Sequence, residues 1–375
     1  MDFCVITNGY PNKNNIYNNG FIHSRVREYK TKGLSGYVIL LNDKENYTYI
    51  YEDIHVHVAT KRHAIELLTD TNPSKILIHF ITRDMFEVVK LANRIQETII
   101  WIHGTEAISW KRRTFNMSLN PLRAVSFLKY VIFNKLQMNY LKKIIIEHGS
   151  SLTFIFVSNW MMQAMIKDLK LEDFTARYFI IPNFVDPRIF KYNQKNEDVM
   201  LNVLSIRSYN SRKYATDIVA KTIIRFSKRP EFKEFTFNIY GNGKFHKKDT
   251  KKIKKYANVH IYNYFLEQKD IPDIHRKNGI MLIPTRQDAQ GVSMCEAVSS
   301  GLIPITSNNT AIPEFIEDDY GYLCSSIDDY VKSLLAIYNN ISKYHQMSIT
   351  GSETMQEICG DSAIIKEIKI ITEGE

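Results

Sequence analysis

The chain has 375 residues, of which 44% are hydrophobic and 12% aromatic, so it is long enough for two domains and too apolar to be disordered. The formal net charge of +9 favours an acidic partner such as nucleic acid, anionic lipid or a phosphorylated substrate, or else a basic solvated surface. The four cysteines, Cys4, Cys295, Cys324 and Cys359, have no CxxC spacing, which argues against a zinc site or a disulfide framework and for a reducing compartment.

The N-terminus and the hydropathy pattern favour a cytoplasmic protein. The first residues, Met1 to Ile6, lack a basic segment followed by a long apolar run, so we expect no signal peptide. No stretch approaches the roughly 20 apolar residues that a membrane-spanning helix needs.

Short apolar runs alternate with helix-length segments along the whole chain, which predicts βα units and parallel sheets. In the first half the expected strands are 3–7, 37–41, 76–80, 98–102, 154–157 and 178–181. In the second half they are 201–206, 235–240, 259–262, 279–283 and 303–306. Two such series predict an α/β protein with two doubly wound domains.

A turn and a polar segment separate the two series. The sequence Pro182-Asn183-Phe184-Val185-Asp186 favours a turn, and the polar run 191–198 is typical of a linker. We therefore expect an N-terminal domain over residues 1–190 and a second domain over residues 191–350.

Two carboxylates lie eight positions apart in the stretch D-A-Q-G-V-S-M-C-E, which runs from Asp288 to Glu296. An apolar run, 280–284, precedes the stretch, and another, 301–306, follows it. The pattern predicts a strand, a loop that carries Asp288, a helix that carries Glu296 in its first turns near residue 295, and another strand. Open α/β sheets bind ligands at this edge, beside helix N-termini, so both acids could accept hydroxyls of one ligand.

An ordered set of motifs resembles the retaining glycosyltransferases of family 4, which have the GT-B fold. The resemblance covers roughly residues 3–325 and is densest in the second half. It rests on Asn19-Gly20-Phe21, Trp101-Ile102-His103-Gly104, Pro182 to Asp186 (with Phe184 in place of the usual glycine), Arg207 with Lys213, Gly241-Asn242-Gly243, Asp288 to Glu296, and Ile312-Pro313-Glu314.

The resemblance implies two Rossmann-like domains that face each other across a cleft. The first would bind a glycan or lipid-linked acceptor, and the second a nucleotide-sugar, with UDP as the expected nucleotide. The segment 351–375 would cross back to the first domain. The implied reaction is retaining transfer of a sugar to an acceptor hydroxyl, as in the assembly of bacterial surface polysaccharides and other glycans.

Similarity to the family assigns Arg207 and Lys213 to the donor diphosphate, where positive charge stabilises the leaving group. Arg212, next to Lys213, competes for the lysine's role, and both cations could instead be solvated at a helix start. Glu296 resembles the glutamate that accepts the ribose hydroxyls, although a glutamate in a first helical turn could serve the helix dipole alone. Asp288 would face the sugar, in place of the usual glutamate.

Further positions complete the implied site. The backbone N–H groups of Gln290, Gly291 and Val292 would help to hold the sugar and the phosphate. The family commonly has an aromatic residue or glycine where Gln290 stands, so the sugar stays open. His103 would contact the sugar at the reacting centre, although a histidine at a strand end is more often structural. Gly20 would let backbone amides approach the diphosphate.

Residues 111–143 form a strongly basic region. Its cations are interleaved with apolar residues near helical spacing; they are Lys111, Arg112, Arg113, Arg123, Lys129, Lys135, Lys142 and Lys143. Such a helix could lie on an anionic membrane at its inner face. The alternative is a helix that packs on the core through Leu122, Val125, Leu128 and their successors and exposes a basic face.

We expect no metal or other cofactor, because the chain lacks a D-x-D signature between its expected strands. Two other functions stay open. A glycoside phosphorylase or hydrolase could use Asp288 and Glu296 as an acid/base pair, but hydrolysis needs two carboxyls across the scissile bond. The charge of +9 allows a nucleic-acid-binding protein, yet no RNP, KH or zinc pattern occurs, so we expect no nucleic-acid partner. A sugar-binding homologue without turnover is a third alternative.

Overall fold

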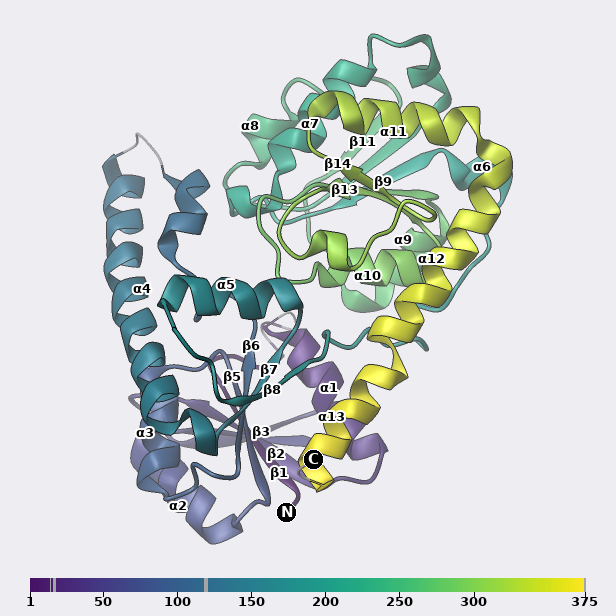
Figure 1. Cartoon of the computed structure of the whole chain (residues 1–375). Helices are drawn as coiled ribbons and strands as arrows, with labels where there is room; N and C mark the ends of the chain where they lie inside the picture. Colours follow the sequence, from purple (N-terminus) through teal and green to yellow (C-terminus); the bar gives the residue numbers. More distant parts are fainter. Residues whose placement is uncertain (14, 16–17, 118–120, 374–375) are drawn as a thin grey trace. The chain divides into compact units, whose positions relative to one another are not determined.

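The computed structural model describes residues 1–13, 15, 18–117 and 121–373, and these residues form two compact α/β units. Unit 1 comprises residues 1–112, 118–184 and 362–375, and unit 2 comprises residues 113–117 and 185–361. Two parallel-sheet units confirm the expected fold class (Figure 1). The division falls between Phe184 and Val185 rather than after residue 190, and the chain returns to unit 1 at Ser362 rather than at residue 351. Residues 118–120, within the basic region, and 374–375 lie outside the described residues.

Unit 1 is built on an eight-stranded sheet with the order β3-β4-β2-β1-β5-β6-β7-β8. Its strands are β1 (Phe3–Thr7), β2 (Gly36–Leu41), β3 (Tyr47–Tyr51), β4 (Ile54–Ala59), β5 (Lys75–His79), β6 (Thr98–Ile102), β7 (Thr153–Phe156) and β8 (Arg177–Ile180). All pairs are parallel except β3 with β4, a hairpin closed by Glu52 and Asp53, both with positive φ. The order reverses between β1 and β5, so their carboxyl ends form a topological switch point.

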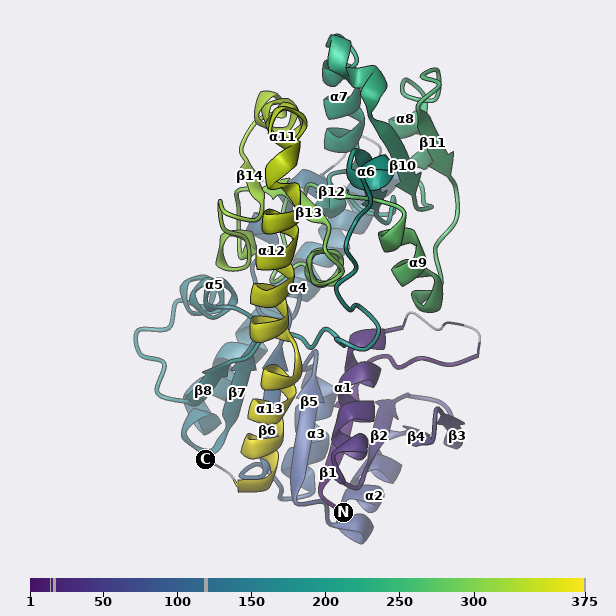
Figure 2. The same ribbon diagram turned by 90° about the vertical axis from the view of Figure 1, so that its right-hand side faces the viewer.

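Helices cover both faces of this sheet. They are α1 (Gly20–Thr31), α2 (Lys61–Thr71), α3 (Arg83–Leu91), α4 (Pro121–His148), α5 (Asn159–Leu169) and α13 (Asp361–Glu373), with a 3-10 turn at Gly149–Ser151. The 3-10 segment Trp110–Asn116 begins in unit 1 and continues into unit 2. The side chains of Thr60, Thr82 and Ser158 cap α2, α3 and α5 by accepting a backbone N–H. Helices α1 and α13 lie side by side over one face of the sheet (Figure 2).

A buried carboxylate ties α13 to the rest of unit 1. Glu367 is fully buried and accepts from Nε of the equally buried Arg25, 2.7 Å away. The hydroxyl of Tyr29 and Nε1 of Trp101 also donate to it. Three donors satisfy a carboxylate that burial would otherwise destabilise by several kcal/mol. Among the described residues, none of the helices combines the length and the apolar character needed to cross a membrane.

Unit 2 is built on a six-stranded, fully parallel sheet with the order β11-β10-β9-β12-β13-β14. The strands are β9 (Asn202–Ile206), β10 (Thr236–Tyr240), β11 (Val259–Tyr262), β12 (Ile280–Ile283), β13 (Ile303–Ser307) and β14 (Tyr322–Cys324). The order reverses between β9 and β12, so this unit also has a switch point at the carboxyl ends of two central strands.

The helices of unit 2 follow its strands. They are α6 (Glu197–Met200), α7 (Thr216–Phe226), α8 (His246–Thr250), α9 (Ile271–Arg276), α10 (Val292–Ser299), α11 (Ile327–Asn339) and α12 (Tyr344–Cys359). Short 3-10 turns lie at Arg212–Tyr214, Pro230–Glu234, Gln268–Asp270, Ile312–Glu314 and Ile341–Lys343. The core gathers apolar residues of the sheet, α7 and α11, including Phe226, Phe237 and Leu334.

Candidate functional site

Arg207 lies directly after β9, at the switch point of unit 2, and is only 7% exposed. Its Nη1 lies 3.4 Å from Oγ of Ser293 on α10, and its Nη2 lies 3.5 Å from the carbonyl of Ile283 at the end of β12. Nε is buried without a hydrogen-bond partner among the described residues. Burial lowers the pKa of Arg207, and the charge of Asp288 opposes this shift. Arg207 is thus a desolvated cation whose hydrogen bonds are long and whose Nε–H has no acceptor, and such a cation is suited to bind an anionic ligand.

Lys213 and Asp288 meet beside this arginine. Lys213 lies in the 3-10 turn Arg212–Tyr214, and its Nζ is 3.8 Å from Oδ1 of Asp288. The ring of Tyr214 lies under both cations, 5.6 Å from the guanidinium of Arg207 and 5.5 Å from Nζ of Lys213. The structure therefore brings together three of the residues that the sequence singled out.

Arg212, the neighbour that competed with Lys213, turns to other partners. Its guanidinium bonds to Oδ2 of Asp249 at 2.7 Å and lies 3.9 Å from the centre of the Phe245 ring. A cation held in this way has a structural role at the start of α8, which favours Lys213 as the second cation of the site.

Helix α10 begins at Val292, so Glu296 lies in its second turn rather than at its start, where the sequence placed it. The earlier start follows from Gly291, whose φ of 87° is unfavourable for a side chain and which ends the loop. Among the described residues, no hydrogen-bond donor contacts the Glu296 carboxyl, and burial raises its pKa to about 8. A helix-dipole role is disfavoured in the second turn, whereas a desolvated acid without a donor is suited to accept ligand hydroxyls.

The loop before α10 has a buried side chain and an uncapped helix end. The amide of Gln290 is 2% exposed, and its Nε2 lies 3.5 Å from Sγ of Cys359 and 3.9 Å from Sγ of Cys295. Gln290 can therefore reach a ligand through its backbone and not its side chain. Among the described residues no side-chain hydrogen bond caps α10, so the backbone N–H of Val292 in its first turn is suited to bind a ligand.

The other two predicted residues belong to unit 1. Gly20 is the first residue of α1, after Asn19 in the left-handed conformation, and a Cβ built on it would meet no atom within 4 Å. His103 follows β6 and its Nε2 lies 2.9 Å from Nδ1 of His79, which ends β5. Sequence reasoning missed His79. The available signal was a histidine at the end of a strand that neighbours the His103 strand.

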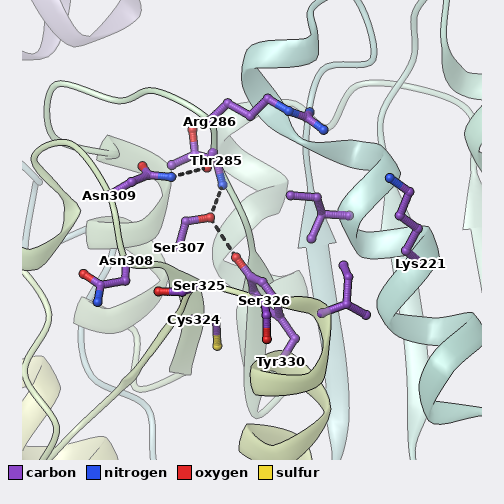
Figure 3. A pocket seen from close by; sticks show the side chains of 12 residues that line it. Lys221, Thr285, Arg286, Ser307, Asn308, Asn309, Cys324, Ser325, Ser326 and Tyr330 are labelled. Atoms are coloured by element: carbon purple, nitrogen blue, oxygen red, sulfur yellow. Dashed lines mark hydrogen bonds between the residues drawn. The ribbon is translucent and has the colours of Figure 1, made fainter. Parts of the chain in front are cut away.

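A pocket of about 400 Å³ lies at the carboxyl ends of β12, β13 and β14, and sequence reasoning missed it as well. Figure 3 shows Thr285, Ser307 and Tyr330 along its wall, with Lys221 of α7 on another side. Oγ of Ser307 accepts the N–H of Thr285 and bonds to the hydroxyl of Tyr330. Thr285 also donates to the carbonyl of Lys213, so this polar pocket adjoins the turn that carries the second cation.

The basic region also carries large apolar side chains that are exposed. The first half of α4 is exposed and extends beyond the carboxyl ends of β5, β6 and β7 (Figure 1). Large apolar side chains with more than half of their surface exposed line it; they are Leu122, Val125, Leu128, Ile132, Phe133 and Leu136. The core-packing alternative is therefore wrong for this half. The helix packs on unit 1 through its second half, which includes Met138 and Leu141.

The cations of this region divide into two groups. Nε of Arg112 pairs with Asp168 at 2.7 Å, and Arg113 donates to the side chain of Gln287 at 3.1 Å. By contrast, Lys111, in the 3-10 turn before α4, is exposed, as are Lys129 and Lys135 on α4, which lie next to the exposed Leu128 and Leu136. The exposed surface of α4 is thus both apolar and basic.

Comparison with known proteins agrees with this architecture. Residues 201–340 match a family model described as glycosyl transferases group 1, and this range holds Arg207, Lys213, Asp288 and Glu296. No curated protein matches the chain. Sucrose-phosphate synthase from Thermosynechococcus elongatus is similar in structure, with a TM-score of 0.71 at 10% identity over 100% of this chain and 99% of that chain.

Two further solved structures are similar. HepE from Anabaena, in complex with UDP and glucose, has a TM-score of 0.70 at 12% identity over 100% of both chains. A mutant of TarM from S. aureus, in complex with UDP and two sugar ligands, has a TM-score of 0.59 at 17% identity over 84% of this chain. This chain spans 59% of the TarM chain. These identities show the fold alone, and the expected GT-B fold is confirmed.

Proposed function

We propose that the chain is a retaining glycosyltransferase of family 4 type that moves a sugar from a UDP-sugar to a hydroxyl of a glycan or lipid-linked acceptor. The observation that carries the proposal is the site at the switch point of unit 2. There a buried Arg207 and Lys213 share the ring of Tyr214, Lys213 contacts Asp288, and Arg207 contacts Ser293 of α10, the helix that also carries Glu296. The match to group 1 glycosyl transferases spans all of these residues, and similar structures bind UDP.

The proposed chemistry uses the residues as follows. Arg207 and Lys213 bind the donor diphosphate and stabilise the charge that it gains as the bond to the sugar breaks. Glu296 accepts the ribose hydroxyls, and Asp288 accepts hydroxyls of the sugar. The acceptor hydroxyl attacks from the face that the diphosphate leaves, and the departing diphosphate takes its proton. The new bond then keeps the anomeric configuration without a covalent enzyme intermediate.

The experiment that tests the proposal is a panel of nucleotide-sugars, scored by nucleotide release with and without lipid-linked acceptors. Release that depends on both donor and acceptor is expected, and NMR of the product should show the anomeric configuration of the donor. Sugar release without a nucleotide donor would instead support a phosphorylase or hydrolase. Binding without turnover across the panel would support a sugar-binding homologue.

At a pH above about 8, where the Glu296 carboxyl is ionised, Glu296→Gln is expected to weaken UDP binding, because the ribose hydroxyls lose a carboxylate that can accept both of them. The matched variant Asp288→Asn should leave the affinity for free UDP near wild type and change the choice of sugar. Isothermal titration with UDP measures both. Unchanged UDP affinity in Glu296→Gln contradicts the ribose role.

The same Glu296→Gln substitution should stabilise the ligand-free protein above pH 4.5. Burial raises the folded-state pKa of Glu296 from 4.5 to about 8, so the folded chain binds this proton more tightly than the unfolded chain. The contribution of this bound proton to the free energy of unfolding is complete below pH 4.5 and is lost as the pH rises to about 8. Because glutamine does not ionise, the gain in Tm over wild type should grow across this window, by about 2–4 °C for each kcal/mol.

Activity is expected to persist in EDTA, because two cations in place of a metal balance the diphosphate charge. The measurement is nucleotide release after dialysis against chelator, with and without added manganese. Complete loss that manganese restores would refute the role of Arg207 and Lys213 as the only countercharge.

We also propose that unit 1 docks on an anionic membrane through α4, as a cytoplasmic protein that meets a lipid-linked acceptor at the inner face. Two properties of the same surface support this: apolar side chains exposed in a protruding half-helix, and exposed lysines beside them. Exposed apolar patches of this kind mark interaction sites, and the lysines favour a negatively charged partner.

A further inference from the structure

Seven lysines form a cluster on the surface of unit 2, in the segment that joins β10 to β11. They fall within the twelve residues 244–255, which contain one acid, Asp249. This short segment therefore carries +6 of the formal net charge of +9 of the whole chain. All members of this lysine cluster are exposed; they are Lys244, Lys247, Lys248, Lys251, Lys252, Lys254 and Lys255.

The protein does not balance the charge of the lysine cluster. Asp249 is buried, and its carboxylate accepts from the guanidinium of Arg212 at 2.7 Å and from the hydroxyl of Thr216. Among the described residues, the lysines that pair with a carboxylate all lie outside this segment. The surface therefore presents a strong positive field that attracts an anionic partner.

The loop before the lysine cluster fastens it to the stretch that carries Arg207. Gly243 has a φ of 141°, and a Cβ built on it would lie 2.6 Å from the backbone nitrogen of Asn210, so only glycine allows this approach. The N–H of Phe245 donates to the carbonyl of Tyr209 at 3.0 Å. The lysine cluster thus begins beside the candidate site, at the carboxyl end of β10, and continues to the amino end of β11.

The composition of the segment indicates the kind of partner. Its cations are lysines and not arginines, so they are mobile point charges rather than planar forks that hold one anion in a fixed geometry. Such charges suit a chain of repeated anionic groups. The large apolar residues, Phe245, Ile253 and Tyr256, are buried or half-buried. In contrast to α4, the segment therefore has neither apolar anchors for a membrane nor exposed rings on which nucleic-acid bases would stack.

We propose that the lysine cluster binds an acidic polymer, a glycan chain with phosphate or carboxylate groups at regular intervals, and that this polymer is the acceptor. The binding surface stands on the charge and exposure of the lysines, whereas the role of the polymer as acceptor rests on the proposed function. Because the cluster starts beside the stretch that carries Arg207 and leads away from it, a chain bound here has one part near the reacting groups and further repeats along the lysines.

Isothermal titration of the full chain tests the binding surface, with long-chain inorganic polyphosphate and the polycarboxylate glycan alginate as probes. Wild type should bind at least one probe, which identifies the anionic group, and the affinity should fall as salt increases. A quadruple glutamine variant of the cluster should bind this probe about tenfold to 10³-fold more weakly. Its substitutions are Lys247→Gln, Lys248→Gln, Lys251→Gln and Lys252→Gln.

The control has the same net charge but loses four exposed lysines that are scattered over the chain, and it should bind like wild type. Its substitutions are Lys32→Gln, Lys90→Gln, Lys277→Gln and Lys343→Gln. Equal losses in the two variants would mean that net charge alone matters, and this would overturn the proposal. Wild type that binds neither probe would overturn it as well. The same holds if wild type binds a single-stranded oligonucleotide of equal charge more tightly than either probe.

Kinetics test the role as acceptor. With an acidic glycan acceptor, the cluster variant should have a KM raised by about the factor that binding loses, with kcat unchanged. With a neutral glycan acceptor, kcat/KM should stay at the wild-type value. An equal loss with the neutral acceptor would mean that the lysines act on the donor, and it would overturn the acceptor role. If no donor is turned over with any acceptor, the proposed function fails while the binding result stands.

Discussion

Arg207→Ala is expected to lower kcat by about 10²–10³-fold, because the deleted charge acts mainly on the leaving diphosphate. The fold should tolerate the change. Among the described residues, Arg207 makes only two hydrogen bonds, both long, at 3.4 and 3.5 Å, and its Nε has no partner there. Removal of a buried cation held in this way should leave Tm unchanged or slightly raised. Single-turnover kinetics and a thermal melt measure the two effects.

Two further variants sharpen this result. Arg207→Lys keeps the charge but not the planar fork, so it should recover only part of the lost rate. Arg225→Ala removes a half-exposed arginine of the same unit that pairs with Asp328, and it should leave kcat unchanged. Wild-type turnover in a folded Arg207→Ala variant would show that the arginine does not contact the diphosphate.

Much of the fold follows from the sequence alone because the central strands are continuous apolar runs between polar segments. Strands 3–7, 98–102 and 259–262 are found at the predicted bounds. The strands that were missed lack this signal. Strand Tyr47–Tyr51 is mostly exposed, and Ile54–Ala59 alternates apolar residues with histidines. Strand Tyr322–Cys324 has only three residues, which is too short for a recognisable hydrophobic pattern.

The local arrangement of the candidate site follows from the sequence where one segment of the chain carries the signal, and it does not follow where partners distant in sequence decide. The spacing of Asp288 and Glu296 around Gly291 locates the loop and helix at the switch point. The choice between Arg212 and Lys213 cannot be read from neighbouring cations, because it depends on Asp249, which lies in another element. Likewise, apolar spacing in α4 does not tell an exposed stripe from a buried one, since both have the same period.

Membrane docking through α4 predicts a large effect of charge reversal. If Lys111, Lys129 and Lys135 each contribute about 1 kcal/mol at an anionic surface, reversal to glutamate costs about 2 kcal/mol at each position. The triple variant should then bind vesicles that contain phosphatidylglycerol about 10⁴-fold more weakly than wild type. Sedimentation with vesicles measures this, and wild-type binding should fall as salt screens the charges.

The apolar half of the surface needs its own variant. Leu128→Asp with Ile132→Asp removes two side chains that are 59% and 54% exposed, each of which would contribute about 1–2 kcal/mol on insertion. Leu91→Asp, at a 70% exposed leucine on α3, is the matched control and should sediment like wild type.

All variants should keep UDP affinity, because the proposed nucleotide site lies in unit 2. Equal sedimentation of wild type with neutral and anionic vesicles would contradict the charge argument. Binding that survives both sets of substitutions would mean that α4 is not the docking surface, and the acceptor would then reach the enzyme from solution.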